Sequence, residues 1–166
     1  MKKVFIMNGR GTSGKTTFET MVKKISEQSE KTVDIISTID YVKGIARDIG
    51  WDGGKSTEDR RFLSDLKDAL TKWKDLPYQV CCEKIDKSTA DAIFVDCREP
   101  EEIERFVKDF NALTVLVQRG PVVIFGNHAD DNVGNYQYDV TIDNSRGLVE
   151  LEEEAKIFFE TFILED

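Results

Sequence analysis

The sequence contains few of the residues that build metal sites and disulfide frameworks. It has a single histidine, His128, and three cysteines, Cys81, Cys82 and Cys97. An odd number of cysteines without framework spacing is typical of reduced thiols in the cytoplasm. Two adjacent cysteines and one distant histidine do not have the spacing of a zinc site. The pattern predicts a cytoplasmic protein whose cysteines are small buried residues.

Long apolar runs and an excess of positive charge are also absent. No run approaches the roughly 20 residues that cross a bilayer, and no small-residue cleavage site follows the N-terminal segment. The 23 Lys and Arg residues are outnumbered by 32 Asp and Glu residues, which gives a net charge of -9. We therefore expect no membrane and no nucleic acid as a partner. A small anionic ligand remains compatible with this charge, because a few local cations suffice to hold it.

The segments that are present alternate between strand and helix. Two amphipathic helices are expected at 39–49 and 56–73. Further helices are expected after Pro77, after Pro100 and from Leu148 onward. The helix at 56–73 begins with capping-box spacing, and its expected buried stripe is Phe62, Leu66, Leu70 and Trp73. The strands are expected at 3–7, 32–38, 91–97, 113–118 and 138–142. This alternation predicts a single three-layer α/β/α domain of 166 residues with about five strands, mostly parallel.

A glycine-rich loop lies between the first strand and the first helix. Gly9, Gly14, Lys15 and Thr16 fit the pattern G-x-x-x-x-G-K-[ST] of a P-loop. In such a loop the backbone N–H groups point at phosphate oxygens, and the helix N-terminus adds its positive dipole. The lysine reaches the β- and γ-phosphates of ATP. The predicted ATP-binding residues are Gly9, Gly11, Thr12, Ser13, Gly14, Lys15, Thr16 and Thr17.

An acid and an arginine follow the buried strand at 91–97. Asp96 closes the apolar run "AIFVD", as a Walker-B acid does, so Thr16 and Asp96 are the predicted Mg²⁺ ligands. Arg98 has a planar guanidinium that can hold a second phosphate, so it is a predicted acceptor-binding residue. Lys15 and Arg98 are both predicted to be catalytic. Glu99 is expected to cap the next helix.

Further cations lie at other strand ends. Asp40, Lys43 and Arg47 share one helical face opposite the apolar one, which predicts an acceptor site but is also typical of a solvated surface. Arg60 is a further acceptor-binding candidate. Arg119 begins the long segment 119–137, which has the length of a lid, and is the predicted third catalytic residue, with Arg146 as a second choice.

Several segments together resemble one enzyme family. The loop at 9–16 is followed by "STIDYVKGIA", "DRRFLSDLKD", "VDCREPEEI" and "YDVTIDNSRGLVELEEEA", and this combination resembles the phage-type deoxynucleoside monophosphate kinases, which are small P-loop kinases. The resemblance covers nearly the whole chain. It implies Mg²⁺-dependent transfer of the γ-phosphoryl group of ATP to a nucleoside monophosphate, in the host cytoplasm if a phage encodes the chain. It also implies a five-stranded parallel sheet, an acceptor-binding helical region at about 39–90 and a lid at about 119–137.

Two features depart from related kinases. No arginine lies between Arg119 and Arg146, whereas many monophosphate kinases have several lid arginines. The "D-G-[FY]-P-R" segment of adenylate kinases is replaced by "DCREP". The predicted function is therefore phosphorylation of a nucleoside monophosphate by ATP, with adenylate kinase itself disfavoured.

Two other functions remain open at this point. One is a P-loop kinase for another small phosphorylated metabolite such as phosphomevalonate, and the other is a nucleotide-binding regulator without turnover. A GTPase is disfavoured because "GNHAD" is a poor substitute for the guanine motif "NKxD". The sequence does not decide which base or sugar is accepted or whether the chain forms a homodimer.

Overall fold

The structure is a computed structural model that describes residues 2–120 and 132–165. Its helices and strands alternate along the chain, as the sequence predicts, except that three helices follow one another after the second strand. They are β1 (Lys3–Asn8), α1 (Lys15–Gln28), β2 (Val33–Ser37), α2 (Asp40–Asp48), α3 (Thr57–Lys74), α4 (Leu76–Lys87), β3 (Ala92–Asp96), α5 (Pro100–Phe110), β4 (Leu113–Gln118), β5 (Val140–Asp143), α7 (Leu148–Phe159) and the π-helical turn η1 (Glu160–Leu164).

The chain divides into two compact units. The first, the sheet unit, comprises Met1–Ile35 and Thr89–Asp166. The second, the helical unit, comprises Ile36–Ser88 and contains α2, α3 and α4.

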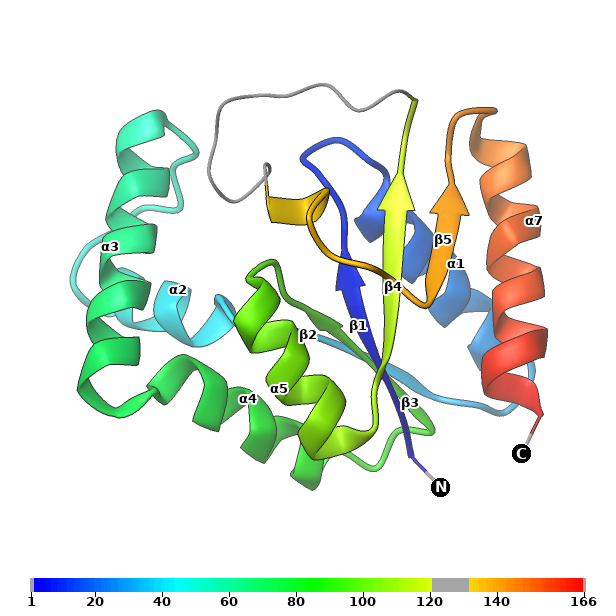
Figure 1. Cartoon of the computed structure of the whole chain (residues 1–166), viewed down its shortest axis with the longest axis horizontal. Helices are drawn as coiled ribbons and strands as arrows, with labels where there is room; N and C mark the ends of the chain where they lie inside the picture. Colours follow the sequence, from blue (N-terminus) through cyan, green and yellow to red (C-terminus); the bar gives the residue numbers. More distant parts are fainter. Residues whose placement is uncertain (1, 121–131, 166) are drawn as a thin grey trace. The chain divides into compact units, whose positions relative to one another are not determined.

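Five strands form one sheet in the order β2-β3-β1-β4-β5 (Figure 1). β1 pairs in parallel with β3 and with β4, and β4 pairs in parallel with β5. The predicted α/β class with a five-stranded parallel sheet is therefore confirmed. The register places Met7 opposite Asp96, so the carboxyl end of β3 lies beside the carboxyl end of β1.

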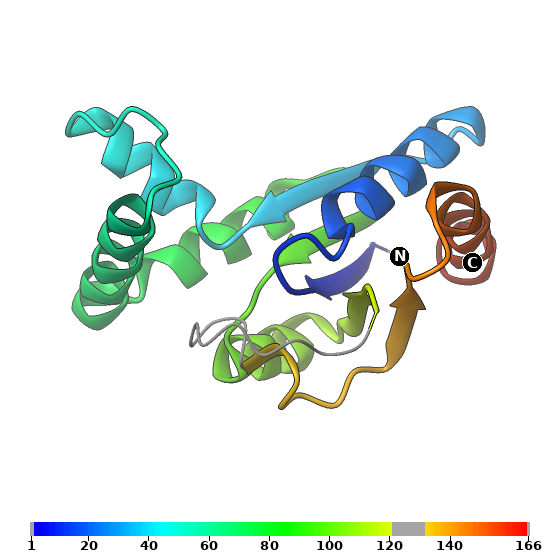
Figure 2. The same cartoon turned by 90° about the horizontal axis from the view of Figure 1, so that it is seen from above.

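The central strands are buried on both faces, which explains their continuous apolar runs. Successive side chains of β1 point to opposite faces. Phe5 and Met7 belong to the cluster that includes buried residues of α1 and α7, while α5 packs against β1 and β4. Figure 2 shows α1 and α7 on one side of the sheet and α5 on the other. The sheet unit thus has the predicted three layers.

Aromatic rings fill the space between the sheet and α7. Phe158 meets Phe5, Phe18 and Phe94 with ring centroids 5.2, 5.4 and 6.0 Å apart. These edge-to-face contacts add to the burial of the rings themselves. All four rings are at most 2% exposed, so they belong to the buried core between the sheet, α1 and α7.

The helical unit is held by local capping and by packing among its helices. The Ser56 hydroxyl and the Asp59 carboxylate form the predicted capping box at the start of α3. The expected buried stripe of α3 is only partly correct, because Trp73 is 67% exposed. The Lys74 ammonium lies 4.9 Å from the centroid of the Trp73 ring. Periodicity identifies the apolar face of a helix but not how much of it a neighbour covers, and no residue of α3 is fully buried.

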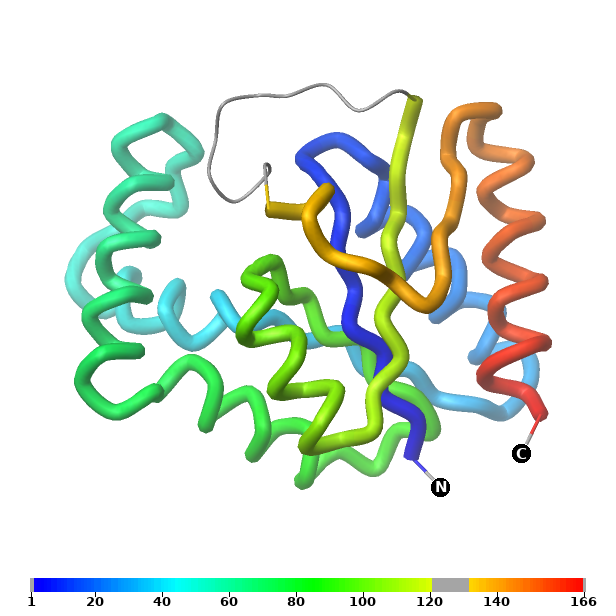
Figure 3. Tube along the Cα trace, viewed as in Figure 1, coloured from blue at the N-terminus to red at the C-terminus, as the bar shows by residue number. Residues whose placement is uncertain are grey.

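Figure 3 shows the start of β1 and the end of η1 on the same side of the sheet unit. The Lys3 ammonium donates to the main-chain carbonyl of Glu165. None of the three cysteines is in a disulfide, and Cys81 and Cys97 are buried. No helix within 2–120 or 132–165 is long and apolar enough to cross a membrane.

The aromatic cluster predicts a large cost for truncating its central ring. We expect Phe158→Ala to lower the free energy of unfolding by about 3–5 kcal/mol, because it removes buried surface and leaves a cavity. Its neighbour Ile157 is 58% exposed, and Ile157→Ala is expected to cost about 0.5 kcal/mol or less. Urea unfolding of both variants measures the difference, and equal losses would contradict the assignment of Phe158 to the core.

Candidate active site

The loop between β1 and α1 has a backbone that requires two of its glycines. A Cβ on Gly9 would lie 2.5 Å from the Ser13 hydroxyl oxygen and 2.7 Å from the Val117 carbonyl. Gly14 has φ +92°, in the left-handed region, and a Cβ there would lie 2.2 Å from the Asn144 amide nitrogen. Both glycines are therefore needed for the loop to close against its neighbours.

Asn8 secures the start of the loop. Its side-chain oxygen accepts a hydrogen bond of 2.8 Å from the Gly9 N–H, and its amide donates to the Tyr138 hydroxyl at 2.8 Å. The hydroxyl in turn donates to the Val133 carbonyl at 3.2 Å. Burial raises the pKa of Tyr138 to about 12, so this hydroxyl keeps its proton at neutral pH. Asn8 is 1% exposed, and no sequence pattern pointed to it.

Lys15 lies in the first turn of α1 and faces two acids. Its ammonium forms an ion pair with Asp96 Oδ1 and lies 3.5 Å from Glu19 Oε1. The Lys15 side chain is 14% exposed and that of Asp96 26%. The structure thus brings the predicted catalytic lysine and the predicted metal-binding acid into direct contact.

Glu19 is a buried acid that the sequence analysis missed. It lies one helical turn after Lys15 and its side chain is 1% exposed. Its Oε1 accepts no hydrogen bond within the described residues. Burial, with a smaller effect of Asp96, raises the pKa of Glu19 from 4.5 to about 8, and the nearby Lys15 charge opposes this shift. The only signal in the sequence was an acid between Phe18 and Val22 on the buried side of the helix.

The candidate site contains groups suited to Mg²⁺ in company with phosphate. No cluster of three or more His, Cys, Asp or Glu side chains that could hold a metal is present in 2–120 and 132–165. The exposed Thr16 and the carboxylate of Asp96 remain, one at the start of α1 and the other at the end of β3. One or two protein oxygens with phosphates and water are what Mg²⁺ uses in nucleotide sites, so these residues fit the ion. They would not fit a metal held by protein ligands alone.

The turn from β3 to α5 contains both exposed and buried side chains. Arg98 is exposed. Glu99 occupies the N-cap position of α5, but its side chain accepts no capping hydrogen bond, so the expected capping role is not seen. The Cys97 thiol donates to Glu102 Oε2 at 3.3 Å in a buried contact. Asp96, the last residue of β3, therefore contacts Lys15, whereas Arg98, two residues later, is exposed.

The helical unit holds the other predicted acceptor residues. Asp40 Oδ2 accepts a hydrogen bond of 2.9 Å from the Ser37 N–H, which ties the start of α2. Lys43 is half-buried. The Arg47 guanidinium lies 5.6 Å from the centroid of the Trp51 ring, whose Nε1 donates to Asp59. Trp51, whose role the sequence left open, thus links α2 to the start of α3.

The arginines of the helical unit and of the predicted lid lie in exposed places. Arg60 is exposed in the first turn of α3. Arg119 is exposed after β4, and the lid residues 121–131 lie outside the described residues. The second choice, Arg146, pairs with Glu154 at 3.3 Å. The structure therefore does not bring a lid arginine to Lys15.

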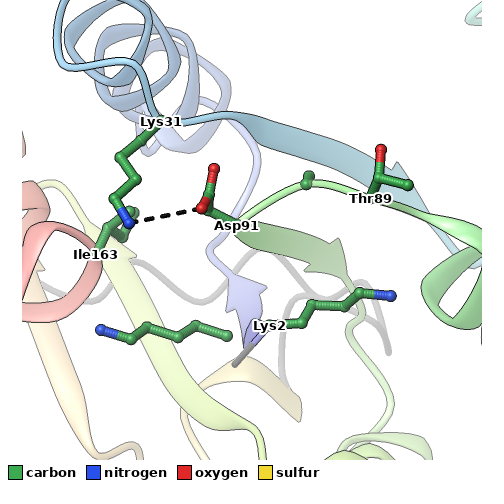
Figure 4. Close-up of a pocket in the computed structure, with 7 residues that line it drawn as sticks. Lys2, Lys31, Thr89, Asp91 and Ile163 are labelled. Atoms are coloured by element: carbon green, nitrogen blue, oxygen red, sulfur yellow. Dashed lines mark ion pairs between the residues drawn. The ribbon is translucent and has the colours of Figure 1, made fainter. Parts of the chain in front are cut away.

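A separate cavity of about 250 Å³ lies near the amino ends of the strands, away from the glycine loop. Its lining includes Lys2, Lys31 and Asp91, which precede β1, β2 and β3. Figure 4 shows Lys31 reaching toward Asp91, and their ion pair measures 3.5 Å. Ligands of parallel α/β folds bind at the carboxyl ends of the strands, so we place the candidate site at the loop and not in this cavity.

Comparison with known proteins supports the fold assignment. No protein-family model matches the chain, and no curated protein matches it in sequence. Among solved structures it is similar to TT1252 of Thermus thermophilus, with a TM-score of 0.57 and 15% identity over 96% of this chain and 98% of that one. It is also similar to shikimate kinase of Aquifex aeolicus, with a TM-score of 0.52 and 11% identity over 95% and 96% of the two chains. At these identities the similarity shows the fold alone, an α/β fold that this chain shares with a known kinase.

The raised pKa of Glu19 predicts a dependence of stability on pH. The folded state holds a proton on Glu19 between pH 4.5 and 8, where the unfolded state releases it. The free energy of unfolding therefore falls as pH rises through this window, by at most about 1.4 kcal/mol per pH unit. Glu19→Gln removes this contribution, so its stability relative to the unmodified chain should increase from pH 5 to pH 8.

Urea unfolding at several pH values measures this difference. Glu27→Gln is the matched control, because Glu27 is an exposed acid on the same helix, and its difference from the unmodified chain should change little. A Glu19→Gln difference that is the same at pH 5 and pH 8 would contradict the raised pKa.

Proposed function

We propose that the chain is a nucleoside monophosphate kinase, which transfers the γ-phosphoryl group of ATP to a nucleoside or deoxynucleoside monophosphate. The observation that supports this most strongly is the contact between Lys15 and Asp96 at the carboxyl edge of the sheet. The contact places a cation and an acid beside the glycine loop, whose residues Gly11, Thr12 and Thr16 are exposed. Phosphoryl transfer needs this combination, because its catalysis consists mainly of positioning and charge compensation.

The donor side of the reaction is assigned to the loop and α1. Backbone N–H groups of residues 11–17 bind the phosphates of ATP, aided by the positive end of the α1 dipole. Lys15 leaves the carboxylates and pairs with the β- and γ-phosphates. The residues that would hold Mg²⁺ are Thr16, through its hydroxyl, and Asp96, through its carboxylate. When bound, the ion would neutralise part of the charge on the transferred group.

The acceptor side is assigned to cations outside the loop. A monophosphate carries close to two negative charges, and it must approach an ATP that is already anionic. With a net charge of -9, the chain as a whole does not attract it, so local cations have to. The proposed acceptor-binding residues are Arg98 at the end of β3 and, in the helical unit, Asp40, Lys43, Arg47 and Arg60. Arg119 is the proposed lid-side catalytic cation.

Lys15 and the acceptor panel provide the first test. ADP release with Mg²⁺ should depend on one or more members of a panel of ribo- and deoxynucleoside monophosphates. Lys15→Met should lower turnover by at least about 100-fold, since it removes a charge aimed at the transferred group. Methionine keeps the apolar stem, but losing the ammonium leaves the Asp96 carboxylate without its cation. Folding of the variant is therefore verified by urea titration.

The panel also separates the alternatives. Turnover only with a non-nucleotide phosphorylated metabolite, such as phosphomevalonate, would replace the acceptor class and keep the donor site. ATP binding without turnover of any acceptor would favour a nucleotide-binding regulator. The absence of ATP binding would contradict the proposal altogether.

Arg98 gives the sharpest prediction for the acceptor site. A guanidinium that holds the monophosphate through paired charge-assisted hydrogen bonds should contribute strongly to its binding. Arg98→Ala should therefore raise the acceptor KM by at least about tenfold, while ATP affinity measured by calorimetry changes less than about twofold. Arg98→Lys should restore only part of the loss, because an ammonium cannot form the same fork.

Arg105→Ala is the matched control, since Arg105 is an exposed arginine on the following helix α5. It should leave both constants unchanged. If ATP affinity falls while the acceptor KM holds, Arg98 belongs to the donor site. If neither constant moves, the acceptor phosphate is held elsewhere, and Lys43, Arg47 and Arg60 become the residues to test.

A further inference from the structure

Asn144 is a buried polar residue that the proposed function does not use. It follows β5 directly and is 7% exposed. Its backbone N–H donates to the Gln118 carbonyl at 2.8 Å, where β4 ends. Its side-chain amide donates to the Ser13 carbonyl at 2.9 Å, in a buried hydrogen bond between residues 131 positions apart. Asn144 thus connects the end of the sheet to the middle of the glycine loop.

The local turn does not need this side chain. The Ser145 N–H donates to the Asp143 carboxylate at 2.9 Å, so Asp143 supplies the side-chain bond that stabilises the turn after β5. The amide of Asn144 is directed instead to the loop. A buried amide in a turn that another residue already stabilises requires a different explanation.

The hydrogen bond sets the direction of one peptide group. In a trans peptide the carbonyl and the following N–H point in opposite directions. A Ser13 carbonyl held toward Asn144 therefore directs the Gly14 N–H away from Asn144. The fit is close, because a Cβ on Gly14 would lie 2.2 Å from the Asn144 nitrogen and 3.8 Å from Leu151 Cδ2. Asn144 and Leu151 thus support the loop on the side where Gly14 lacks a side chain.

We propose that Asn144 is a positioning residue for the phosphate-binding loop: its amide fixes the peptide between Ser13 and Gly14 so that the Gly14 N–H is presented to a phosphate of the donor nucleotide. The inference depends on the proposed function only in that the donor phosphates bind at this loop. It does not depend on which acceptor is used. Asn144 acts through the backbone of the loop and not on the base or sugar.

Two substitutions separate the hydrogen bond from the shape of the side chain. Asn144→Ala removes the amide, and ATP affinity should fall about tenfold, the factor expected for one buried hydrogen bond. Asn144→Asp keeps the shape but sets a carboxylate oxygen against the Ser13 carbonyl and near the phosphates, so the loss should be larger. Ser145→Ala, in the same turn and exposed, is the matched control and should leave ATP affinity unchanged.

Tripolyphosphate distinguishes an effect on the loop from an effect on the base. Calorimetry measures ATP binding, and competition against ATP measures tripolyphosphate, with each variant first shown to be folded by circular dichroism and urea titration. We expect Asn144→Ala to weaken both ligands by the same factor and to leave the acceptor KM unchanged. If Asn144→Ala lowers stability but leaves the affinity of the folded protein for both ligands unchanged, Asn144 has only a structural role and the inference is overturned.

The remaining outcomes also decide the question. Weaker ATP binding with unchanged tripolyphosphate binding would assign Asn144 to the base or sugar and overturn the inference. Unchanged binding of both ligands by the variants would overturn it while the proposed function stands. If the unmodified chain binds neither ligand, the proposed function fails, and the inference fails with it.

Discussion

The contact between Lys15 and Asp96 depends on two parallel strands that end side by side. β1 leads into the glycine loop and α1, and β3 ends at Asp96, opposite Met7. If β3 ran antiparallel to β1, its carboxyl end would lie at the far edge of the sheet and its acid could not reach Lys15. The crossover helices that parallel strands require also cover both faces of the sheet, so the same topology makes the core and the site.

The candidate site combines a fixed backbone with charges that can change partners. The loop is held on one side by Asn8 and on the other by Asn144, through buried hydrogen bonds. Lys15 instead lies between two carboxyl groups, Asp96 and Glu19. In the proposed function, phosphates take the place of Asp96 as the partner of Lys15, and the Asp96 carboxylate would then be free to hold Mg²⁺. The Asp96 carboxylate therefore compensates the charge of Lys15 until an anionic ligand takes its place.

The sequence predicts the alternation of elements and the position of the loop because these depend on local patterns. Glycines, a capping box and apolar periodicity are visible within a few residues of one another. Glu19 and Asn144 were missed because their importance lies in partners far along the chain or in the depth of burial, which the strand register decides. The exposure of Trp73 was missed for a related reason, since the coverage of a helix depends on its neighbours. For Glu19, the only sequence signal was an acid between apolar residues on the buried side of α1.

A crystal structure with Mg²⁺ and a non-hydrolysable ATP analogue tests the central claim most directly. The account predicts that the triphosphate lies in the loop, that the Lys15 ammonium has moved from Asp96 to the phosphates, and that Asp96 faces the metal ion. An analogue bound away from the loop, or a triphosphate in the loop with Lys15 still paired to Asp96, would contradict it.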